Sequence, residues 1–264
     1  MPTRTHTPCR RSIKLYCGPD HLKISKVSWN GAEVSLENDP YSAHPLALPL
    51  PNAALRGASS GPDLGTWLAT GEAWADIITT FLPDDPFVVD LGCGCGKLAR
   101  FLYLNTKVRY LGLDLFLPAI AWCRDAFGPL AGRRFRFEHF DGRSAAYNPG
   151  GTIDPAAYVL PLGDATVDIT ICASLFTHLS EPICRHYLQE IARILRVGGR
   201  AIVSIHIEPA AGSSFSGSEE RIDIAPAYFK KLAADSGLRE RTTVGNVYGQ
   251  MVIVFEKPEQ TTSG

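Results

Sequence analysis

The segment Phe87–Lys97 constrains the fold of this chain more than any other stretch. It reads FVVDLGCGCGK, so apolar residues typical of a strand buried on both faces lead directly into glycines at alternate positions. Glycine allows positive φ angles and close approach of a ligand, because it has no Cβ. The apolar spacing of residues 98–104 predicts a helix next. A strand, a glycine loop and a helix in this order predict a small-molecule site on an α/β sheet.

The spacing of the glycines separates two classes of cofactor. A dinucleotide-binding loop follows G-x-G-x-x-G, and Lys97 stands where its third glycine would fall. The observed pattern is G-x-G-x-G, with Asp90 shortly before it. The stretch Val89–Gly96 resembles the first motif of the class I S-adenosylmethionine-dependent methyltransferases. This resemblance implies a doubly wound α/β fold with a mostly parallel, seven-stranded, Rossmann-like sheet.

Further segments extend the resemblance over roughly residues 65–257. Residues 108–113 predict the next strand, and Asp114 at its carboxyl end is placed to accept both hydroxyls of a ribose. The other predicted elements are strands over 134–141, 169–174 and 200–207, a helix over 180–197 ended by Gly198-Gly199, a helix over 226–236, and strands over 238–244 and 249–256. The family adds one antiparallel strand to the otherwise parallel sheet.

The resemblance also implies a set of cofactor-binding residues. The predicted S-adenosylmethionine contacts are Asp90, Gly92, Gly94, Gly96, Asp114, Leu115, Asp141, Gly142 and Ser174. In the family an acidic or polar residue contacts the adenine amino group, which makes Asp141 and Gly142 the candidates for that edge. No metal site is predicted, because Cys93 and Cys95 suit close packing in a glycine turn. A metal role for His206 and Glu208 is conceivable, but two ligand types two residues apart are a weak signal.

Methyl transfer to a hydroxyl needs a base that removes the proton. His178, just beyond the strand predicted over 169–174, is the candidate by residue type and location. The alternative is a histidine that packs or hydrogen-bonds locally where a helix begins. Tyr147 and Asn148 lie in the insertion 141–150, before Leu160-Pro161, and we predict that they shape the acceptor pocket. Their alternative role is to build a turn.

Composition narrows the function classes. The chain has 264 residues, of which 45% are hydrophobic, enough to bury a full core. A net charge of −1 and a pI near 6.6 provide no global basic field for nucleic acid or anionic lipid. No apolar run approaches the roughly 20 residues needed to cross a membrane. The odd number of cysteines and the lack of an apolar signal core predict a cytoplasmic protein.

Three segments are predicted along the chain: an N-terminal extension (1–62), a methyltransferase domain (63–258) and a flexible tail (259–264). Within the extension, alternating residues on either side of Asn30-Gly31 predict a β-hairpin over 21–36. Residues 40–62 contain many prolines and glycines and predict an irregular cap. A helix is predicted over 64–82.

The leading functional hypothesis is an S-adenosylmethionine-dependent methyltransferase that methylates an oxygen of a small molecule or sugar. A looser resemblance, in residues 48–72 and in the insertion 141–150, is to a bacterial group associated with cell-surface glycan or specialised-metabolite pathways. A methyltransferase acting on RNA or protein is the first alternative. Against it stand the charge balance and the sequence Ala173–Phe176, where an Asn/Asp-Pro-Pro-aromatic motif would occur. A non-catalytic cofactor-binding partner subunit is the second alternative.

Overall fold

The structure is a computed structural model that describes residues 14–17, 24–29, 32–35 and 48–259. By its internal contacts the chain forms two units, Met1–Leu50 and Pro51–Gly264. In the first unit, three strands form an antiparallel sheet: β1 (Lys14–Cys17), β2 (Ile24–Trp29) and β3 (Ala32–Ser35). The pairing of β2 with β3 matches the predicted hairpin, whose Asn30-Gly31 turn lies outside the described residues.

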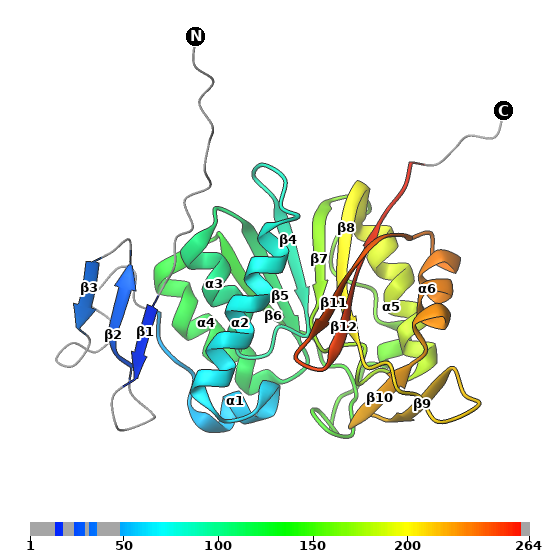
Figure 1. The fold of residues 1–264 in the computed structure, drawn as a ribbon, viewed down its shortest axis with the longest axis horizontal. Helices are drawn as coiled ribbons and strands as arrows, with labels where there is room; N and C mark the ends of the chain where they lie inside the picture. Colours follow the sequence, from blue (N-terminus) through cyan, green and yellow to red (C-terminus); the bar gives the residue numbers. More distant parts are fainter. Residues whose placement is uncertain (1–13, 18–23, 30–31, 36–47, 260–264) are drawn as a thin grey trace, which may run out of the picture. The chain divides into compact units, whose positions relative to one another are not determined.

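The second unit is built on a seven-stranded sheet with the order β11-β12-β8-β7-β4-β5-β6 (Figure 1). Its strands are β4 (Phe87–Leu91), β5 (Arg109–Asp114), β6 (Phe135–His139), β7 (Val167–Cys172), β8 (Leu195–Ile205), β11 (Arg239–Val247) and β12 (Gln250–Glu256). Strands β4 to β8 run parallel, β12 runs antiparallel to β8, and β11 runs antiparallel to β12. The predicted fold class is confirmed.

The strand order changes direction at β4, because β5 and β6 lie on one side of it and β7 and β8 on the other. In open α/β sheets, ligands bind in the crevice outside the carboxyl ends of the strands at such a point. The glycine loop follows β4 directly. The topology therefore places the loop at the expected binding edge of the sheet.

Helices pack on both faces of the sheet. They are α1 (Ala53–Ser60), α2 (Leu64–Thr79), α3 (Lys97–Asn105), α4 (Leu117–Ala131), α5 (Glu181–Ile194) and α6 (Pro226–Asp235). Val89 and Leu91 of β4 belong to a core cluster that also contains Leu188 of α5 and Phe229 of α6. Successive side chains of a strand point to opposite faces, so Asp90 points to the other face.

The helix predicted over 180–197 ends earlier, at Ile194. Leu195 has an extended ψ of 136° and pairs with Val167 of β7, so it begins β8. Gly198 lies inside that strand with a φ of +76°, and its N–H donates to the carbonyl of Lys257. The prediction that Gly198-Gly199 ends the helix is wrong because pairing with the neighbouring strand overrides the local helical pattern.

The sequence analysis did not predict α4 or the 3-10 helix η1 (Pro155–Ala157), and it missed two further features that border the pocket. The first is α1, within the stretch predicted to be irregular; its N-cap Asn52 accepts a hydrogen bond from the N–H of Leu55 at 2.9 Å. The second is the antiparallel hairpin of β9 (Phe215–Ser218) and β10 (Arg221–Ile224). The other predicted strands and helices of this unit are present, with ends shifted by a few residues. The domain boundaries at 62 and 258 and the flexible tail stay predictions.

Candidate functional site

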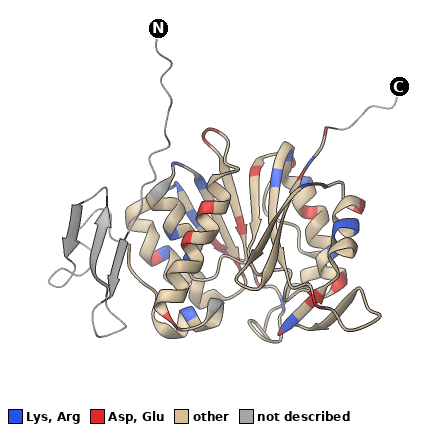
Figure 2. Cartoon of the chain, in the orientation of Figure 1, with Lys and Arg blue, Asp and Glu red and all other residues tan. Residues whose placement is uncertain are grey.

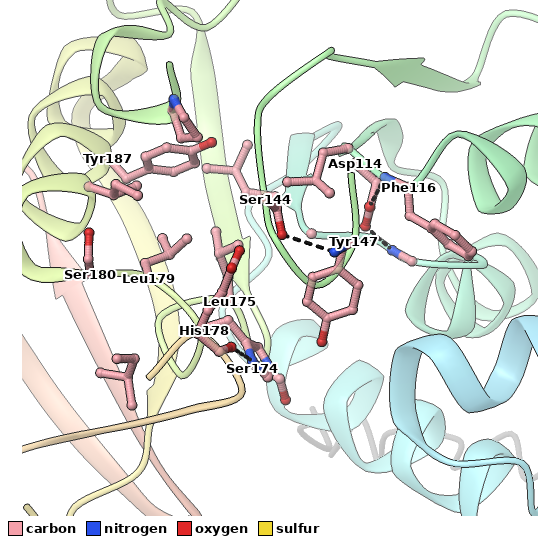
Figure 3. Close-up of a pocket in the computed structure, with 18 of the residues that line it drawn as sticks. Asp114, Phe116, Ser144, Tyr147, Ser174, Leu175, His178, Leu179, Ser180 and Tyr187 are labelled. Atoms are coloured by element: carbon pink, nitrogen blue, oxygen red, sulfur yellow. Dashed lines mark hydrogen bonds between the residues drawn. The ribbon is translucent and has the colours of Figure 1, made fainter. Parts of the chain in front are cut away.

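A pocket of about 490 Å³ opens at the carboxyl ends of β4, β5 and β7 (Figure 3). The insertion between β6 and β7, helix α5 and the β9–β10 hairpin complete its walls. Seven of the predicted site residues line it: Gly92, Gly94, Asp114, Leu115, Tyr147, Ser174 and His178. The other predicted residues, Asp90, Gly96, Asp141, Gly142 and Asn148, do not line it.

The glycine loop is held against the end of β5. The N–H groups of Gly92 and Cys93 both donate to the carbonyl of Leu113, at 2.8 and 3.2 Å. Gly92 and Gly94 have φ angles of +78° and +52°, which glycine adopts without steric cost. The loop therefore presents backbone rather than side chains to the pocket, and leaves space for a ligand to lie close to it.

Asp114 joins the glycine loop to the turn after β5. Its Oδ2 accepts the N–H of Gly94 at 2.7 Å, and its Oδ1 accepts the N–H of Phe116 at 2.8 Å. Burial raises the pKa of Asp114, and these N–H groups oppose the rise. Each carboxylate oxygen has a second acceptor position. Asp114 can therefore hold the loop and still accept hydrogen bonds from ribose hydroxyls on the pocket side.

Asp90 lies behind the loop rather than in the pocket. It is 3% exposed and accepts a 2.6 Å hydrogen bond from the hydroxyl of Tyr110 in β5. Burial raises the pKa of Asp90 to about 7, although the Tyr110 hydroxyl acts in the opposite direction. The structure thus gives Asp90 a contact within the core, between neighbouring strands.

Asp141 and Asn148 bond to each other inside the insertion. The side-chain amide of Asn148 donates to Asp141 Oδ1 at 3.0 Å and to the carbonyl of Gly142 at 3.1 Å. Thr152 donates its N–H and hydroxyl to Asp141 Oδ2. These donors lower the pKa of Asp141. Asn148 therefore builds a turn, while contact of Asp141 with adenine stays a prediction.

His178 lies in the pocket between two other segments. Its Nδ1 is 2.9 Å from the carbonyl oxygen of Glu219, at the tip of the β9–β10 hairpin. Its ring meets the ring of Tyr147 edge to face, with centroids 5.8 Å apart. A carbonyl only accepts, so Nδ1 carries the proton of the neutral imidazole and Nε2 is the basic nitrogen.

Ser174 has an unusual backbone conformation, with a φ of +60°. A non-glycine residue in this region persists where its surroundings hold it. Its N–H donates to Ser204 Oγ at 2.8 Å, and its hydroxyl donates to Gln250 Oε1 of β12 at 3.1 Å. Ser204 donates to the same Gln250 oxygen at 2.6 Å. These bonds shape the turn that carries Leu175 and His178 into the pocket.

Several wall residues were missed by sequence reasoning. They include Phe116, Phe140, Arg143, Tyr187, Glu219 and Ile222. Phe116 and Phe140 follow β5 and β6 by one or two positions, so proximity to a strand end was a usable signal. Glu219 had no such signal, because the hairpin that carries it was not predicted. Figure 3 shows Asp114 and Phe116 on one side of the pocket, Tyr187 and Leu179 on the other.

Among the described residues, cysteines and potential metal ligands form no second centre. Cys93 and Cys95 are buried, and burial raises the pKa of the Cys93 thiol well above its ordinary value. Within the described part of the chain, no group of three His, Cys, Asp or Glu side chains could hold a metal ion. None of the described helices is long and apolar enough to cross a membrane.

Comparisons with known proteins agree with this geometry. Residues 88–199 match the family model described as a methyltransferase domain. A TehB-like SAM-dependent methyltransferase from Corynebacterium glutamicum has 21% identity and a TM-score of 0.51, with 71% of this chain and 87% of that chain covered.

Two further solved structures share the fold. The 1,6-didemethyltoxoflavin-N1-methyltransferase of Burkholderia thailandensis, with bound 1,6-didemethyltoxoflavin and S-adenosylhomocysteine, has 17% identity and a TM-score of 0.57; 97% of this chain and 99% of that chain are covered. The glycopeptide N-methyltransferase MtfA, complexed with S-adenosylmethionine, has 15% identity and a TM-score of 0.53, with 72% of this chain and 94% of that chain covered. The family match indicates a methyltransferase domain over residues 88–199, and the solved structures show the same fold.

Proposed function

We propose that this protein transfers the methyl group of S-adenosylmethionine to a hydroxyl oxygen of a small molecule or sugar. One observation carries the proposal: a single pocket contains both the glycine loop with Asp114 and a histidine whose Nδ1 is bonded to a carbonyl. The first group suits a nucleoside cofactor. The second suits removal of a proton from an acceptor.

The pocket walls fit the cofactor. Gly92 and Gly94 leave backbone exposed for close approach, Asp114 offers free acceptor positions to a ribose, and Leu115 adds an apolar surface beside them. The bound cofactor would supply an electrophilic methyl group on a sulfonium. The protein would hold the acceptor oxygen in line with it and exclude water. His178 Nε2 would take the hydroxyl proton.

The far wall of the pocket favours an acceptor with an apolar face. It is formed by Leu175, Leu179, Ile183, Tyr187 and Ile222. Two proteins of the same fold are a glycopeptide N-methyltransferase and an N1-methyltransferase with bound 1,6-didemethyltoxoflavin. They support a small acceptor here and make nitrogen the alternative methylated atom. In Figure 2 basic and acidic residues are interspersed over the described chain, which does not favour an RNA acceptor.

The test has two stages. Calorimetry should detect binding of S-adenosylmethionine and S-adenosylhomocysteine but not of NAD; NAD binding with no response to either of the other two would overturn the proposal. A labelled methyl group should then move from the cofactor into a small-molecule fraction of a metabolite extract, detected by mass spectrometry. Label in an RNA or protein fraction would support the first alternative. Cofactor binding without transfer into any fraction would support a non-catalytic partner subunit.

A further inference from the structure

The pocket has two covers that come from distant parts of the chain. One is the insertion loop 144–148, closed by reciprocal backbone hydrogen bonds between Ser144 and Asn148 at 3.1 and 3.0 Å. The other is the β9–β10 hairpin, whose tip between the strands is formed by Glu219 and Glu220. Each cover is internally ordered by its own bonds. Glu219 makes a contact between the two covers.

The hairpin is anchored to the body of the fold near its base. The N–H of Ile222 donates to the carbonyl of Thr177 at 2.7 Å, and the N–H of Ile224 donates to the carbonyl of His206 at 2.8 Å. Gly217 has a φ of +114°, and a Cβ there would collide with the carbonyl of Arg221. The hairpin therefore turns tightly over the pocket and carries its tip toward the insertion.

Glu219 contacts both other segments at this point. Its side-chain Oε2 accepts the N–H of Ala145 in the insertion at 2.9 Å. Its backbone carbonyl accepts the Nδ1 proton of His178 at 2.9 Å. The ring of Tyr147, two residues after Ala145, packs edge to face on the ring of His178. One residue therefore bonds to one cover through its side chain and orients the pocket histidine through its backbone.

We propose that Glu219 is a positioning residue that fastens the hairpin to the insertion and thereby fixes the tautomer of His178. The role of this tautomer in proton removal rests on the proposed function. When the carboxylate of Glu219 holds Ala145, the hairpin tip stays in place and its carbonyl keeps the proton on Nδ1. The Nε2 of His178 is then free to accept a proton. When the contact breaks, the carbonyl moves with the tip and the imidazole loses this constraint.

The chain offers a matched set of variants. Glu219→Ala removes the acceptor for Ala145, while Glu219→Gln keeps a side-chain oxygen that can accept the same N–H. Glu220→Ala is the control, because Glu220 is exposed and makes no hydrogen bond or ion pair with the described part of the chain. Melting temperatures of all variants should stay close to that of the unmodified protein, since the substituted carboxylates lie at a hairpin tip.

The first measurement is hydrogen exchange of the cofactor-free protein. In Glu219→Ala the amide of Ala145 should exchange about ten-fold faster, as expected for loss of a hydrogen bond to a charged acceptor at a partly exposed site. Glu219→Gln should restore most of the protection, and Glu220→Ala should match the unmodified protein. Unchanged exchange in Glu219→Ala, or equal acceleration in Glu220→Ala, would overturn the proposal.

The second measurement is the tautomer of His178, read from the nitrogen chemical shifts of its ring by NMR. The unmodified protein and Glu220→Ala should show the Nδ1–H form, whereas Glu219→Ala should gain the Nε2–H form. A tautomer that is the same in all variants would remove the link between the contact and His178. Both measurements use protein without cofactor, so their failure is distinguishable from failure of the proposed function, which calorimetry with S-adenosylhomocysteine tests separately.

Discussion

The two sides of the pocket are built in different ways. On the cofactor side, the loop after β4 bonds to the backbone and carboxylate at the end of the adjacent strand β5, through Leu113 and Asp114. On the covering side, the hairpin tip bonds to an insertion 74 residues away through Glu219. The cofactor side rests on the geometry of neighbouring parallel strands. The covering side depends on contacts between irregular segments.

The largest expected effect is on turnover, in a variant that lacks the imidazole of His178. If its Nε2 takes the acceptor proton, His178→Ala should lower turnover by about 10²–10⁴ and leave the affinity for S-adenosylhomocysteine nearly unchanged. Steady-state kinetics with the identified acceptor, together with calorimetry, measures both quantities. A packing role predicts a lower melting temperature and weaker binding, with turnover per folded molecule retained. That result would turn the search for a base to Tyr147, His206 or Glu208.

Replacing Asp90 tests whether the carboxylate behind the glycine loop contributes to cofactor affinity or to the free energy of unfolding. Its folded pKa of about 7 lies above the ordinary value of 3.8, so the folded state holds the proton more tightly. The stability that this provides is present below about pH 4 and is lost as pH rises through 7. The loss reaches up to about 4 kcal/mol, because each pKa unit corresponds to about 1.4 kcal/mol.

The Asp90→Asn variant should not suffer this loss, since the amide is neutral and can still accept from Tyr110. Its free energy of unfolding should therefore rise relative to that of the unmodified protein between pH 4 and 8, as measured by urea titration. Its affinity for S-adenosylhomocysteine should be within a few-fold of the original. If the free energy of unfolding of the two proteins changed in the same way with pH, or if the variant lost much of its affinity, Asp90 would be assigned to cofactor binding rather than to the core.

Asp114 and Asp141 form a matched pair, each near the carboxyl end of a neighbouring strand. Losing a charged acceptor costs about 1.5–3 kcal/mol, so Asp114→Ala should weaken cofactor binding by roughly ten- to hundred-fold. Asp141→Ala should weaken it less, because Asp141 does not line the pocket and its carboxylate is bonded to Asn148 and Thr152. Calorimetry compares the two variants. Equal losses would support the predicted contact of Asp141 with adenine.

The sheet and the cofactor side were predictable because their signals are local. Buried strands, the glycine spacing and an acidic strand end occur within short windows around Asp90 and Asp114. Local signals also have limits. The alternation of a strand does not by itself say which face borders the pocket, so the sequence did not show that the Asp90 side chain points into the core. Contact of Asp90 with the cofactor stays a prediction. The end of α5 was misplaced because strand pairing of Leu195 overrides helical spacing.

The covering side was less predictable for the same physical reason. Tyr147 was predicted to line the pocket from its place in the insertion, and the structure places it there. Nothing near Glu219 in the sequence indicates that its carbonyl meets His178, because that contact depends on how a hairpin of two four-residue strands folds back. Contacts of this kind depend on tertiary packing rather than on residue type or spacing.

The hydrogen bonds that Gln250 Oε1 accepts from Ser174 and Ser204 also bear on how the protein is made. Gln250 opens the strand β12, which is inserted between β8 and β11 although it is the last strand in the chain. A ribosome delivers the amino-terminal part first, so β4, β5 and β7 emerge before β12. The turn after β7 cannot gain its final hydrogen bonds until residue 250 has left the exit tunnel. Chains stalled before that residue would carry the glycine loop while lacking the support for the turn that leads to His178.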